Sequence, residues 1–476
     1  MPRKYFGTDG IRGEYGVEPL TYEFFKILGL AIGKSLFKSE NHKKKIIFGQ
    51  DTRESSKKII EAISIGLLES DCEIHSAGIV PTPAISLYAK KGSCIFKNNK
   101  KIFVSEYDLG IMVSASHNLY KDNGIKIFDN QGIKISKDEE SHIEDYIEIF
   151  KNKTIAWKYD DNFFKDKDKD KDKDKDELDK RFKTIDLQQQ YIDFCLSTLN
   201  KITKKYNLTL DLANGANYEI AEKVFHQAGF KINIINNKPN GKNINDKCGS
   251  TYLKNIPDIV KNNNSDYGIS MDGDGDRLVI VNSKGQILDG DDIIYTIIKG
   301  KIILDEKIKG VVGTIMTNQA LENFLKSEDI KFLRSSVGDK NVFDKMIENK
   351  FITGGETSGH ILMLKYSSTG DSIVAALQFL YYSDILNQKN IKNYLDKYPQ
   401  KITNLFVEKN VSNNIINIAI KEAHDKYESS KLRLIIRKSG TENCIRIMVE
   451  AKDKIFVDNI SKEIEIFIAR KLKSLL

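Results

Sequence analysis

The fold prediction depends on one stretch, Asp272-Gly-Asp-Gly-Asp-Arg277. The apolar runs on either side, 267–271 and 278–281, are typical of short strands, so the acidic residues are expected on the loop between them. The intervening glycines let the backbone turn so that alternate side chains converge. Neighbouring carboxylates repel one another unless a cation binds between them, and hard oxygen ligands favour Mg²⁺ or Ca²⁺. The stretch therefore predicts a metal-binding loop.

The acidic stretch has two other possible interpretations. An EF-hand calcium loop needs Gly at its sixth position and Glu at its twelfth, where this chain has Arg277 and Ser283. The spacing therefore excludes an EF-hand. A solvated acidic turn without a metal stays open on local composition alone.

Length and composition indicate a multidomain globular protein. A chain of 476 residues is too long for one compact core, and three or four domains are expected. The net charge of +7 is spread along the chain without a basic, aromatic-interleaved stripe, so a nucleic-acid partner is not expected. No run of 18 apolar residues predicts a membrane span, and the first residues do not resemble a signal peptide. The five widely spaced cysteines fit reduced thiols, which favours the cytoplasm.

Apolar runs alternate with helical patterns along most of the chain. Strands are expected at 45–49, 73–77 and 110–113, with helices at 20–37, 54–69 and 82–91. Further βα units are expected over 208–235 and 310–333. This alternation predicts mixed or parallel α/β domains. The tail, 402–476, reads as strand, helix, strand-loop-strand and helix, which predicts a small α+β domain.

Polar clusters occupy the ends of several expected strands. Ser116 and His117 follow the strand at 110–113, with Lys126 nearby, and strand C-termini are where open α/β sheets place ligands. A serine there can act as a nucleophile, and a polar turn is the equally weighted alternative. Residues 354–360 offer an acceptor, a hydroxyl and an imidazole suited to a polyol. The loop 437–446 combines arginines, hydroxyls and a glycine, a set that binds phosphate.

Together these stretches resemble the α-D-phosphohexomutase family over nearly the whole chain. Three of these stretches resemble the branch of the family that acts on glucosamine phosphates. They are residues 5–13, residues 337–340 and the Ser-Gly-Thr-Glu of the tail. The resemblance implies three mixed or parallel α/β domains and a C-terminal α+β domain around a central cleft. The expected boundaries are 1–150 for domain I, 151–185 for a charged linker, 186–287 for domain II, 288–397 for domain III and 398–476 for domain IV.

The resemblance also implies a role for each motif residue. Ser116 would carry the phosphoryl group and bind one Mg²⁺ per chain together with Asp272, Asp274 and Asp276. Groups that move protons or stabilise charge would be His117, Arg12, Lys126, Arg277 and His360. Substrate would be bound by Lys340, Glu356, Ser358, Arg437, Ser439, Gly440, Thr441 and Arg446.

The implied reaction interconverts glucosamine 6-phosphate and glucosamine 1-phosphate. A phosphoserine enzyme and glucosamine 1,6-bisphosphate, acting as intermediate and activator, would carry the phosphoryl group. A mutase for glucose or mannose phosphates is the alternative, and a phosphosugar-binding or nucleic-acid-binding protein without turnover is a third reading. The expected partner is a small phosphosugar, with no membrane and no nucleic acid, and a homodimer is left open.

The chain departs from the family pattern in a few places. Leu119 and Asn443 stand where the family usually has proline, which removes no expected ligand. Residues 92–109 and the Lys-Asp alternation of 165–176 read as insertions, the second one solvated. Ser114 and Ser116 are two residues apart, so strand alternation would place both on one face. Only the motif selects Ser116, and Ser114 is expected to supply at most a supporting hydrogen bond.

Overall fold

The computed structural model describes residues 4–7, 9–37, 44–97, 100–155, 157, 181–408, 411–429, 431–438 and 443–475. The Lys-Asp run of 165–176 and the predicted phosphate-binding residues Ser439, Gly440 and Thr441 lie outside this part of the chain. Contacts divide the chain into two compact units, residues 1–316 with 331–394 and residues 317–330 with 395–476. Among the helices so described, none is both long and apolar enough to cross a membrane.

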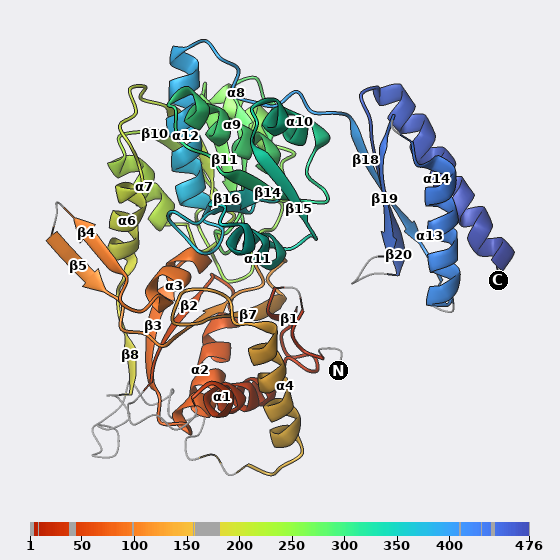
Figure 1. Ribbon diagram of the computed structural model, residues 1–476. Coiled ribbons are helices and arrows are strands. Elements are labelled where there is room, and N and C mark those ends of the chain that lie inside the picture. The colour runs from red at the N-terminus through yellow and green to blue at the C-terminus, as the bar shows by residue number, and fades with distance from the viewer. Residues whose placement is uncertain are drawn as a thin grey trace. The chain divides into compact units, whose positions relative to one another are not determined.

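The first sheet of the larger unit has six strands in the order β1-β7-β6-β2-β3-β8 (Figure 1). They are β1 (Ile11–Glu14), β7 (Asp122–Phe128), β6 (Leu109–Val113), β2 (Lys45–Gln50), β3 (Glu73–Ile79) and β8 (Phe182–Thr184). The central pairs are parallel, and β7 runs antiparallel to both of its neighbours. The edge strand β8 pairs in parallel with β3 although it lies in the segment expected to be a linker. Its three residues were too few to show a strand pattern.

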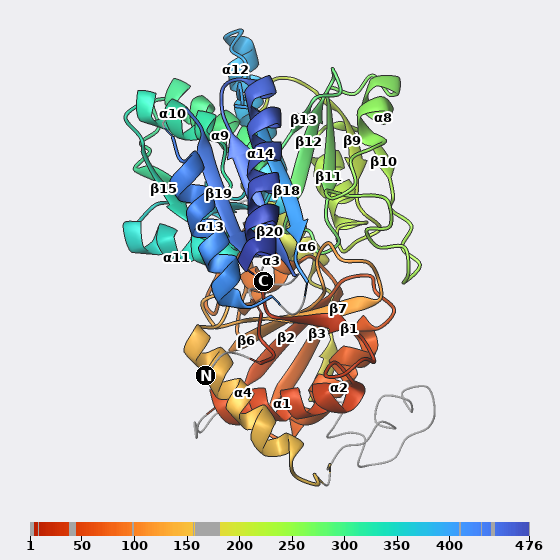
Figure 2. The ribbon, with the colours of Figure 1, turned by 90° about the vertical axis from the view of Figure 1, so that its right-hand side faces the viewer.

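Helices cover both faces of the first sheet. Helices α1 (Tyr22–Leu36), α2 (Ser56–Leu68) and α4 (Lys137–Lys151) lie on one face, and α3 (Thr82–Ala89) lies on the other (Figure 2). Capping by side chains fixes two of these helix starts, because Thr21 accepts from the Phe24 N–H and Ser136 forms a capping box. Residues 92–109 contain a separate hairpin, β4 (Cys94–Lys97) and β5 (Lys100–Val104), and β4 contacts α6 (Gln188–Ser197).

Two further sheets complete the larger unit. The second has the order β10-β9-β11-β12-β13 and the third the order β15-β14-β16-β17. The second sheet's strands are β9 (Asn207–Asp211), β10 (Lys231–Ile235), β11 (Tyr267–Met271), β12 (Leu278–Asn282) and β13 (Ile287–Leu288). The third sheet's strands are β14 (Gly310–Thr314), β15 (Lys331–Ser335), β16 (Thr353–Gly355) and β17 (Ile361–Met363). The helices are α6 (Gln188–Ser197), α7 (Ile220–Gln227), α8 (Ile256–Asn262), α9 (Gly290–Ile303), α11 (Asp339–Asn349) and α12 (Ser372–Gln388).

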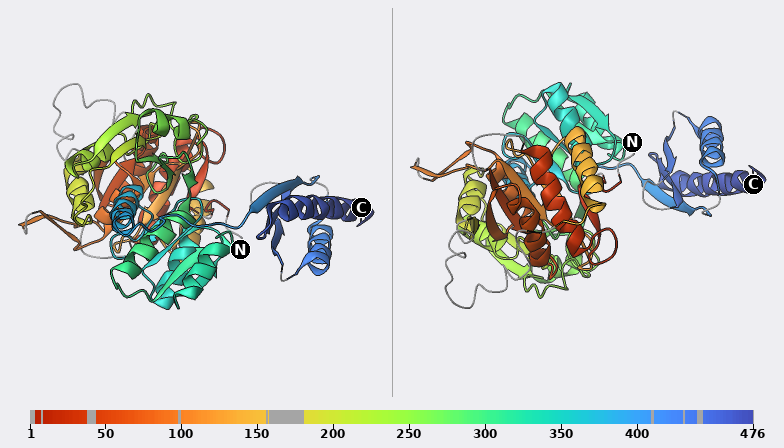
Figure 3. Two further views of the ribbon diagram at one scale, coloured as in Figure 1. Left: turned by 90° about the horizontal axis from the view of Figure 1, so that it is seen from above. Right: turned by 90° about the horizontal axis from the view of Figure 1, so that it is seen from below.

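Helices α9 and α12 join the second and third sheets. They pack against each other, and each contacts strands of both sheets. Figure 3 shows the ribbon from above and from below. Both helices are apolar around much of their circumference, which is typical of helices buried between two layers. This packing therefore fixes the positions of the N-terminal ends of both helices, which lie close to residues 354–360.

The smaller unit is an antiparallel sheet covered by helices. Its sheet has the order β18-β20-β19, with Arg437 and Arg446 directly opposite each other on β19 and β20. The elements are α10 (Gln319–Ser327), β18 (Gln400–Phe406), α13 (Asn413–Tyr427), β19 (Arg433–Lys438), β20 (Cys444–Glu450) and α14 (Lys454–Leu475). The predicted fold class, three α/β domains with a C-terminal α+β domain, is confirmed.

The buried carboxyl that caps α12 predicts a pH-dependent stability. Burial raises the pKa of Asp371 to about 6, while the Val374 N–H and the Tyr191 hydroxyl donate to it. Folding favours the protonated form of this carboxyl, so the protonated form adds to the free energy of unfolding. This contribution is complete below the unfolded pKa of 3.8 and is lost as the pH rises through about 6. Because Asn caps helices well and stays neutral, Asp371→Asn should raise the free energy of unfolding at pH 7.5 by about 2–3 kcal/mol. Melting curves of both proteins between pH 4 and 8 would check this, and a gain that persists undiminished at pH 4 would contradict it.

Burial also predicts how the thiols react. All five cysteines are free, and Cys94 alone is exposed while the others are buried. Burial raises the pKa of Cys72 and of Cys248 to about 12, so little thiolate forms there. Titration with Ellman's reagent should give one fast thiol per native chain and five after denaturation, and Cys94→Ser should remove the fast phase. Two or more fast thiols in the native protein would contradict this packing.

Candidate functional site

Three buried carboxylates lie on the loop between the antiparallel strands β11 and β12. One ligand oxygen from each of Asp272, Asp274 and Asp276 can be chosen so that all lie within 4.8 Å of one another. The Oδ1 atoms of Asp274 and Asp276 are buried and accept no hydrogen bond from the residues that the structure describes. A buried acceptor without a partner is costly, so the unused oxygens fit a bound cation. Gly273 permits the loop to approach Ser116, because a Cβ atom there would lie 2.6 Å from the Ser116 carbonyl oxygen.

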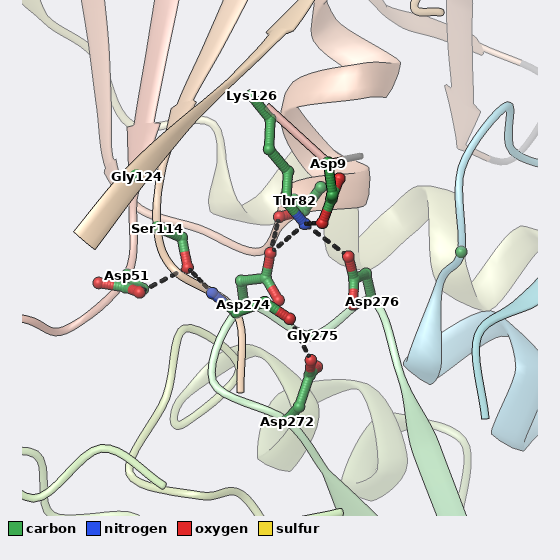
Figure 4. Close-up of polar contacts among 12 residues, drawn as sticks. Asp9, Asp51, Thr82, Ser114, Gly124, Lys126, Asp272, Asp274, Gly275 and Asp276 are labelled. Atoms are coloured by element: carbon green, nitrogen blue, oxygen red, sulfur yellow. Dashed lines mark hydrogen bonds and ion pairs between the residues drawn. The ribbon is translucent and has the colours of Figure 1, made fainter. Parts of the chain in front are cut away.

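The predicted nucleophile touches this carboxylate group. Ser116 donates from Oγ to Asp272 Oδ2 at 2.8 Å and is fully buried. Ser114 Oγ points elsewhere and donates to Asp51 Oδ2 at 2.6 Å (Figure 4). The expected alternation does not hold, because β6 ends at Val113 and Ser116 has a φ of 53°. The backbone therefore turns Ser116 alone towards the carboxylates.

Lys126 supplies a buried positive charge beside the carboxylates. Its Nζ lies 2.7 Å from Asp274 Oδ2, 2.6 Å from Asp276 Oδ2 and 3.5 Å from Asp9 Oδ2 (Figure 4). Burial alone would lower the pKa of Lys126, but these carboxylates raise it well above its usual range. Thr82, at the start of α3, donates a further hydrogen bond to Asp274. Lys126 is therefore a fixed ammonium ion in this arrangement.

The carboxylates carry more negative charge than Lys126 balances. Burial, followed by the neighbouring charges of Asp276 and Asp274, raises the pKa of Asp272 well above its usual range. A group that resists ionisation so strongly is stabilised when a cation binds beside it. The electrostatics and the unused oxygens thus agree that the loop can hold a metal ion.

His117 lies on the other side of the Ser116 hydroxyl. Its Nδ1 accepts from Arg277 Nη1 at 3.0 Å and lies 3.4 Å from Ser116 Oγ. Burial and the positive charge of Arg277 lower the pKa of His117 to about 4. The imidazole is therefore neutral near pH 7, with its proton on Nε2. The guanidinium group of Arg277 therefore lies next to the His117 ring.

The turn between β16 and β17 contains the predicted sugar-binding residues. Glu356 is buried, and its Oε1 accepts from the Gly338 N–H at 2.9 Å, whereas Ser358 is exposed at the corner of the turn. Between them, Thr357 donates to the Asp291 carboxylate at the N-terminus of α9. A Cβ atom at position 290 would lie 2.0 Å from the Glu356 carbonyl oxygen, so only glycine lets the turn rest on this helix. Helix α9 therefore fixes the turn.

His360 connects this turn to the carboxylates. The Gly370 N–H donates to its Nε2 at 3.0 Å, so Nδ1 carries the proton and faces Asp276 Oδ1 at 3.7 Å. The side chain is almost completely buried. The imidazole thus orients an oxygen of the predicted metal site.

A chain of charges that the sequence did not predict joins the same region. Asp9 forms ion pairs with Arg12 and Lys134, and Lys134 also pairs with Asp339 at the start of α11. Burial favours the protonated form of Asp9. Three neighbouring positive charges nevertheless hold the pKa of Asp9 well below its usual range, those of Lys126, Lys134 and Arg12. Asp9 lies within residues 5–13, one of the stretches that resemble the family. Its partners Lys126 and Lys134 come from distant segments, so the stretch alone could not reveal them.

Family models cover most of the chain in order. Those for the α/β/α domains I, II and III of phosphoglucomutase/phosphomannomutase match residues 3–153, 189–285 and 289–402, and the model for the C-terminal domain matches 396–466. The chain belongs to the phosphoglucomutase/phosphomannomutase family. The expected resemblance to the phosphohexomutases is thereby confirmed.

Relatives within the phosphoglucomutase/phosphomannomutase family align over nearly the full length. A phosphoglucosamine mutase of Neisseria gonorrhoeae is 37% identical over 458 residues, which are 95% of this chain and 96% of the relative. One from Buchnera aphidicola is 38% identical over 455 residues, 94% and 92% of the two chains. A solved family structure from Burkholderia thailandensis has a TM-score of 0.75 at 19% identity, covering 98% and 97%. An N-acetylphosphoglucosamine mutase of Aspergillus fumigatus, solved with GlcNAc-6P and magnesium, has a TM-score of 0.60 at 17% identity, covering 99% and 96%.

Three further predicted binding residues, Lys340, Arg437 and Arg446, have contacts of their own. Lys340 directs its ammonium group to the Ile135 carbonyl oxygen and lies 3.8 Å from Glu140, so it links α11 to the start of α4. Arg437 and Arg446 belong to the smaller unit. Burial, and then the positive charge of Arg446 at the paired position of the neighbouring strand, lowers the pKa of Arg437.

Proposed function

We propose that the chain is a phosphoglucosamine mutase that interconverts glucosamine 6-phosphate and glucosamine 1-phosphate. One observation carries the chemistry: the Ser116 hydroxyl lies 2.8 Å from a carboxylate of a buried group of three aspartates. A phosphoserine has a charge of roughly −1.5 to −2 near neutral pH, so it could occupy this position only together with a cation. The names of the relatives, at 36–38% identity, support the choice of glucosamine.

Mg²⁺ is the metal that we propose for the loop. Asp272, Asp274, Asp276 and the phosphoryl group on Ser116 would be its ligands, and hard oxygen donors are what Mg²⁺ prefers. When bound, the ion would neutralise charge on the oxygens of the transferred group. The Aspergillus relative, whose structure was solved with magnesium, supports this choice.

The proposed cycle consists of two phosphoryl transfers. In the first, the sugar hydroxyl attacks the phosphorus, the bond between Ser116 Oγ and phosphorus breaks, and the hydroxyl proton passes to a base. This step produces glucosamine 1,6-bisphosphate. After the bisphosphate turns over in the site, Ser116 Oγ attacks its other phosphate and restores the phosphoserine. Product leaves with the phosphate at the other position.

The polar side chains around Ser116 have proposed roles that follow from their charges. Lys126 and Arg277 stabilise negative charge on the transferred group. His117 Nδ1, at 3.4 Å from Ser116 Oγ, would accept from the serine hydroxyl once Arg277 turns from it to the phosphoryl group. Arg12 and His360 complete the set that moves protons or stabilises charge. Glu356 and Ser358 would read the sugar hydroxyls, and Lys340 would bind substrate if it releases the Ile135 carbonyl.

The proposal places the non-reacting phosphate on the smaller unit. Arg437 and Arg446 occupy paired positions on neighbouring strands, and two guanidinium groups at such positions suit a phosphate. Ser439, Gly440 and Thr441 are proposed as the other contacts.

We propose domain boundaries close to those expected from the sequence, and the ranges of the four family models support them. A cytoplasmic location fits the free cysteines.

A coupled assay on glucosamine 1-phosphate, glucose 1-phosphate and mannose 1-phosphate tests the substrate. Each sugar would be supplied with Mg²⁺ and a trace of the matching 1,6-bisphosphate. The proposal expects the highest kcat/KM for glucosamine 1-phosphate. A clear preference for glucose or mannose would instead establish the sister mutase, which has the same chemistry and reads the sugar differently.

A further inference from the structure

A buried arginine outside the predicted motifs holds the loop that bears the reactive serine. The Arg53 guanidinium has no solvent exposure, and its Nη atoms donate only to main-chain carbonyl oxygens of residues 116–122. These oxygens belong to Ser116 (3.1 Å), Asn118 (2.7 Å), Leu119 and Asp122 (2.9 Å). We propose that Arg53 is a positioning residue for Ser116, an inference that rests on the phosphoserine chemistry proposed above.

The backbone of Ser116 needs such support. Its φ of 53° lies in the left-handed region, which is unfavourable for a residue with a side chain. Outside a strand or helix, its N–H and C=O also lack the partners that regular structure supplies. A serine held loosely here would sample several positions relative to Asp272.

Side chains satisfy both polar groups of the Ser116 backbone. The N–H donates to Ser114 Oγ at 2.8 Å, and Ser114 Oγ in turn donates to Asp51 (Figure 4). The carbonyl oxygen accepts from Arg53, and also from Asn245 Nδ2 at 2.8 Å. Both lines of hydrogen bonds meet at Asp51, because its Oδ2 also accepts from Arg53 Nε at 2.8 Å. The supports of the serine therefore form one connected network.

The chemistry of the site explains why this cation is an arginine. A guanidinium group presents five N–H donors in a rigid plane, so it can bind Asp51 along one edge and several carbonyl oxygens along the others. A lysine has one compact ammonium group and cannot reach oxygens on both sides of the loop. Arg53→Lys should keep the buried charge next to Asp51 and lose the fixed loop geometry.

A positioning role predicts a defect in transfer that substrate binding does not share and that a loss of thermal stability does not explain. For Arg53→Lys we expect kcat to fall about 10²-fold, the loss typical of misplacing a reacting group by about 1 Å. KM for the sugar phosphate should stay within about threefold, because Arg53 contacts no surface that substrate can reach. Phosphorylation of Ser116 by the hexose 1,6-bisphosphate, followed by intact mass, should slow by a similar factor.

Arg181→Lys is the matched control. Arg181 is also buried, and it donates to the Leu68 and Cys72 carbonyl oxygens in the same domain, distant in sequence from the serine loop. It should lose as much thermal stability as Arg53→Lys and keep full kcat. If Arg53→Lys does not fold, Asn245→Ala tests the other donor to the Ser116 carbonyl, with an expected loss of about tenfold.

The assay uses whichever hexose 1-phosphate the wild-type enzyme converts fastest, so a wrong sugar assignment would not affect this test. Wild-type kcat in Arg53→Lys, or equal losses in Arg53→Lys and Arg181→Lys, would overturn the positioning role. A wild-type enzyme that converts none of the three sugars and takes no phosphate on Ser116 would overturn both proposals. A selective fall in kcat and in the rate of serine phosphorylation would support the role.

Discussion

Ser116→Ala is expected to lower kcat by about four to six orders of magnitude, the scale seen when a covalent nucleophile is removed. The variant loses the only atom on which the proposed cycle stores a phosphoryl group. It should still fold, because Ser116 Oγ makes one strong hydrogen bond, to Asp272, and the backbone contacts of residue 116 do not involve the hydroxyl. Steady-state kinetics in the presence of 1,6-bisphosphate would measure the loss.

Ser114→Ala is the control for that experiment. Ser114 is equally buried and only two residues away, but its hydroxyl contacts Asp51 and the Ser116 N–H instead of the carboxylate group. It should keep measurable turnover, reduced by about tenfold because one support of the serine is lost. A Ser116→Ala variant that turns over with its usual activator, or a Ser114→Ala variant that is the more damaged one, would contradict the assignment.

Asp274→Asn is expected to lower kcat by about 10²- to 10⁴-fold, and more of the loss should appear in kcat than in stability. Asn keeps the shape of the side chain but removes a charge that the phosphoserine and its metal require. Lys126 retains its contact with Asp276 at 2.6 Å, so the variant does not leave a buried ammonium unpaired. Activity as a function of Mg²⁺ concentration, with calorimetric titration of the metal, would measure the effect.

Asp384→Asn controls for the loss of a buried carboxylate as such. Asp384 is buried and accepts from the backbone and hydroxyl of Thr203, with no contact to the metal loop. Its variant should bind Mg²⁺ like the wild type and retain kcat. Wild-type activity of Asp274→Asn in excess chelator would rule out a metal on this loop.

Sequence periodicity predicted most regular elements of the fold because each contains enough residues to show its pattern. The strands on either side of the acidic loop are buried at every position, and both appear where the apolar runs placed them. The edge strand β8 was missed because three residues cannot reveal alternation, and its pairing depends on a partner more than 100 residues away. Contacts over such distances leave no local pattern in one sequence.

The acidic loop was predictable for a related reason, since its three carboxylates lie within five consecutive residues, 272–276. The network that holds Ser116 was not. Asp51 and Arg53 follow β2, Ser114 follows β6 and Asn245 comes from the loop after β10, so the fold alone brings them together. The orientation of Ser116 was equally hidden, because its positive φ breaks the alternation that a strand would impose.

The position of a covalent phosphate tests the central claim most directly. Protein purified under conditions that preserve phosphoserine would be exposed to glucosamine 1,6-bisphosphate, digested and mapped by mass spectrometry. The account predicts an added phosphate on Ser116, its loss when glucosamine 6-phosphate is supplied in excess, and none on Ser114. A phosphate on Ser114, or a protein that turns over without any phosphate on Ser116, would contradict it.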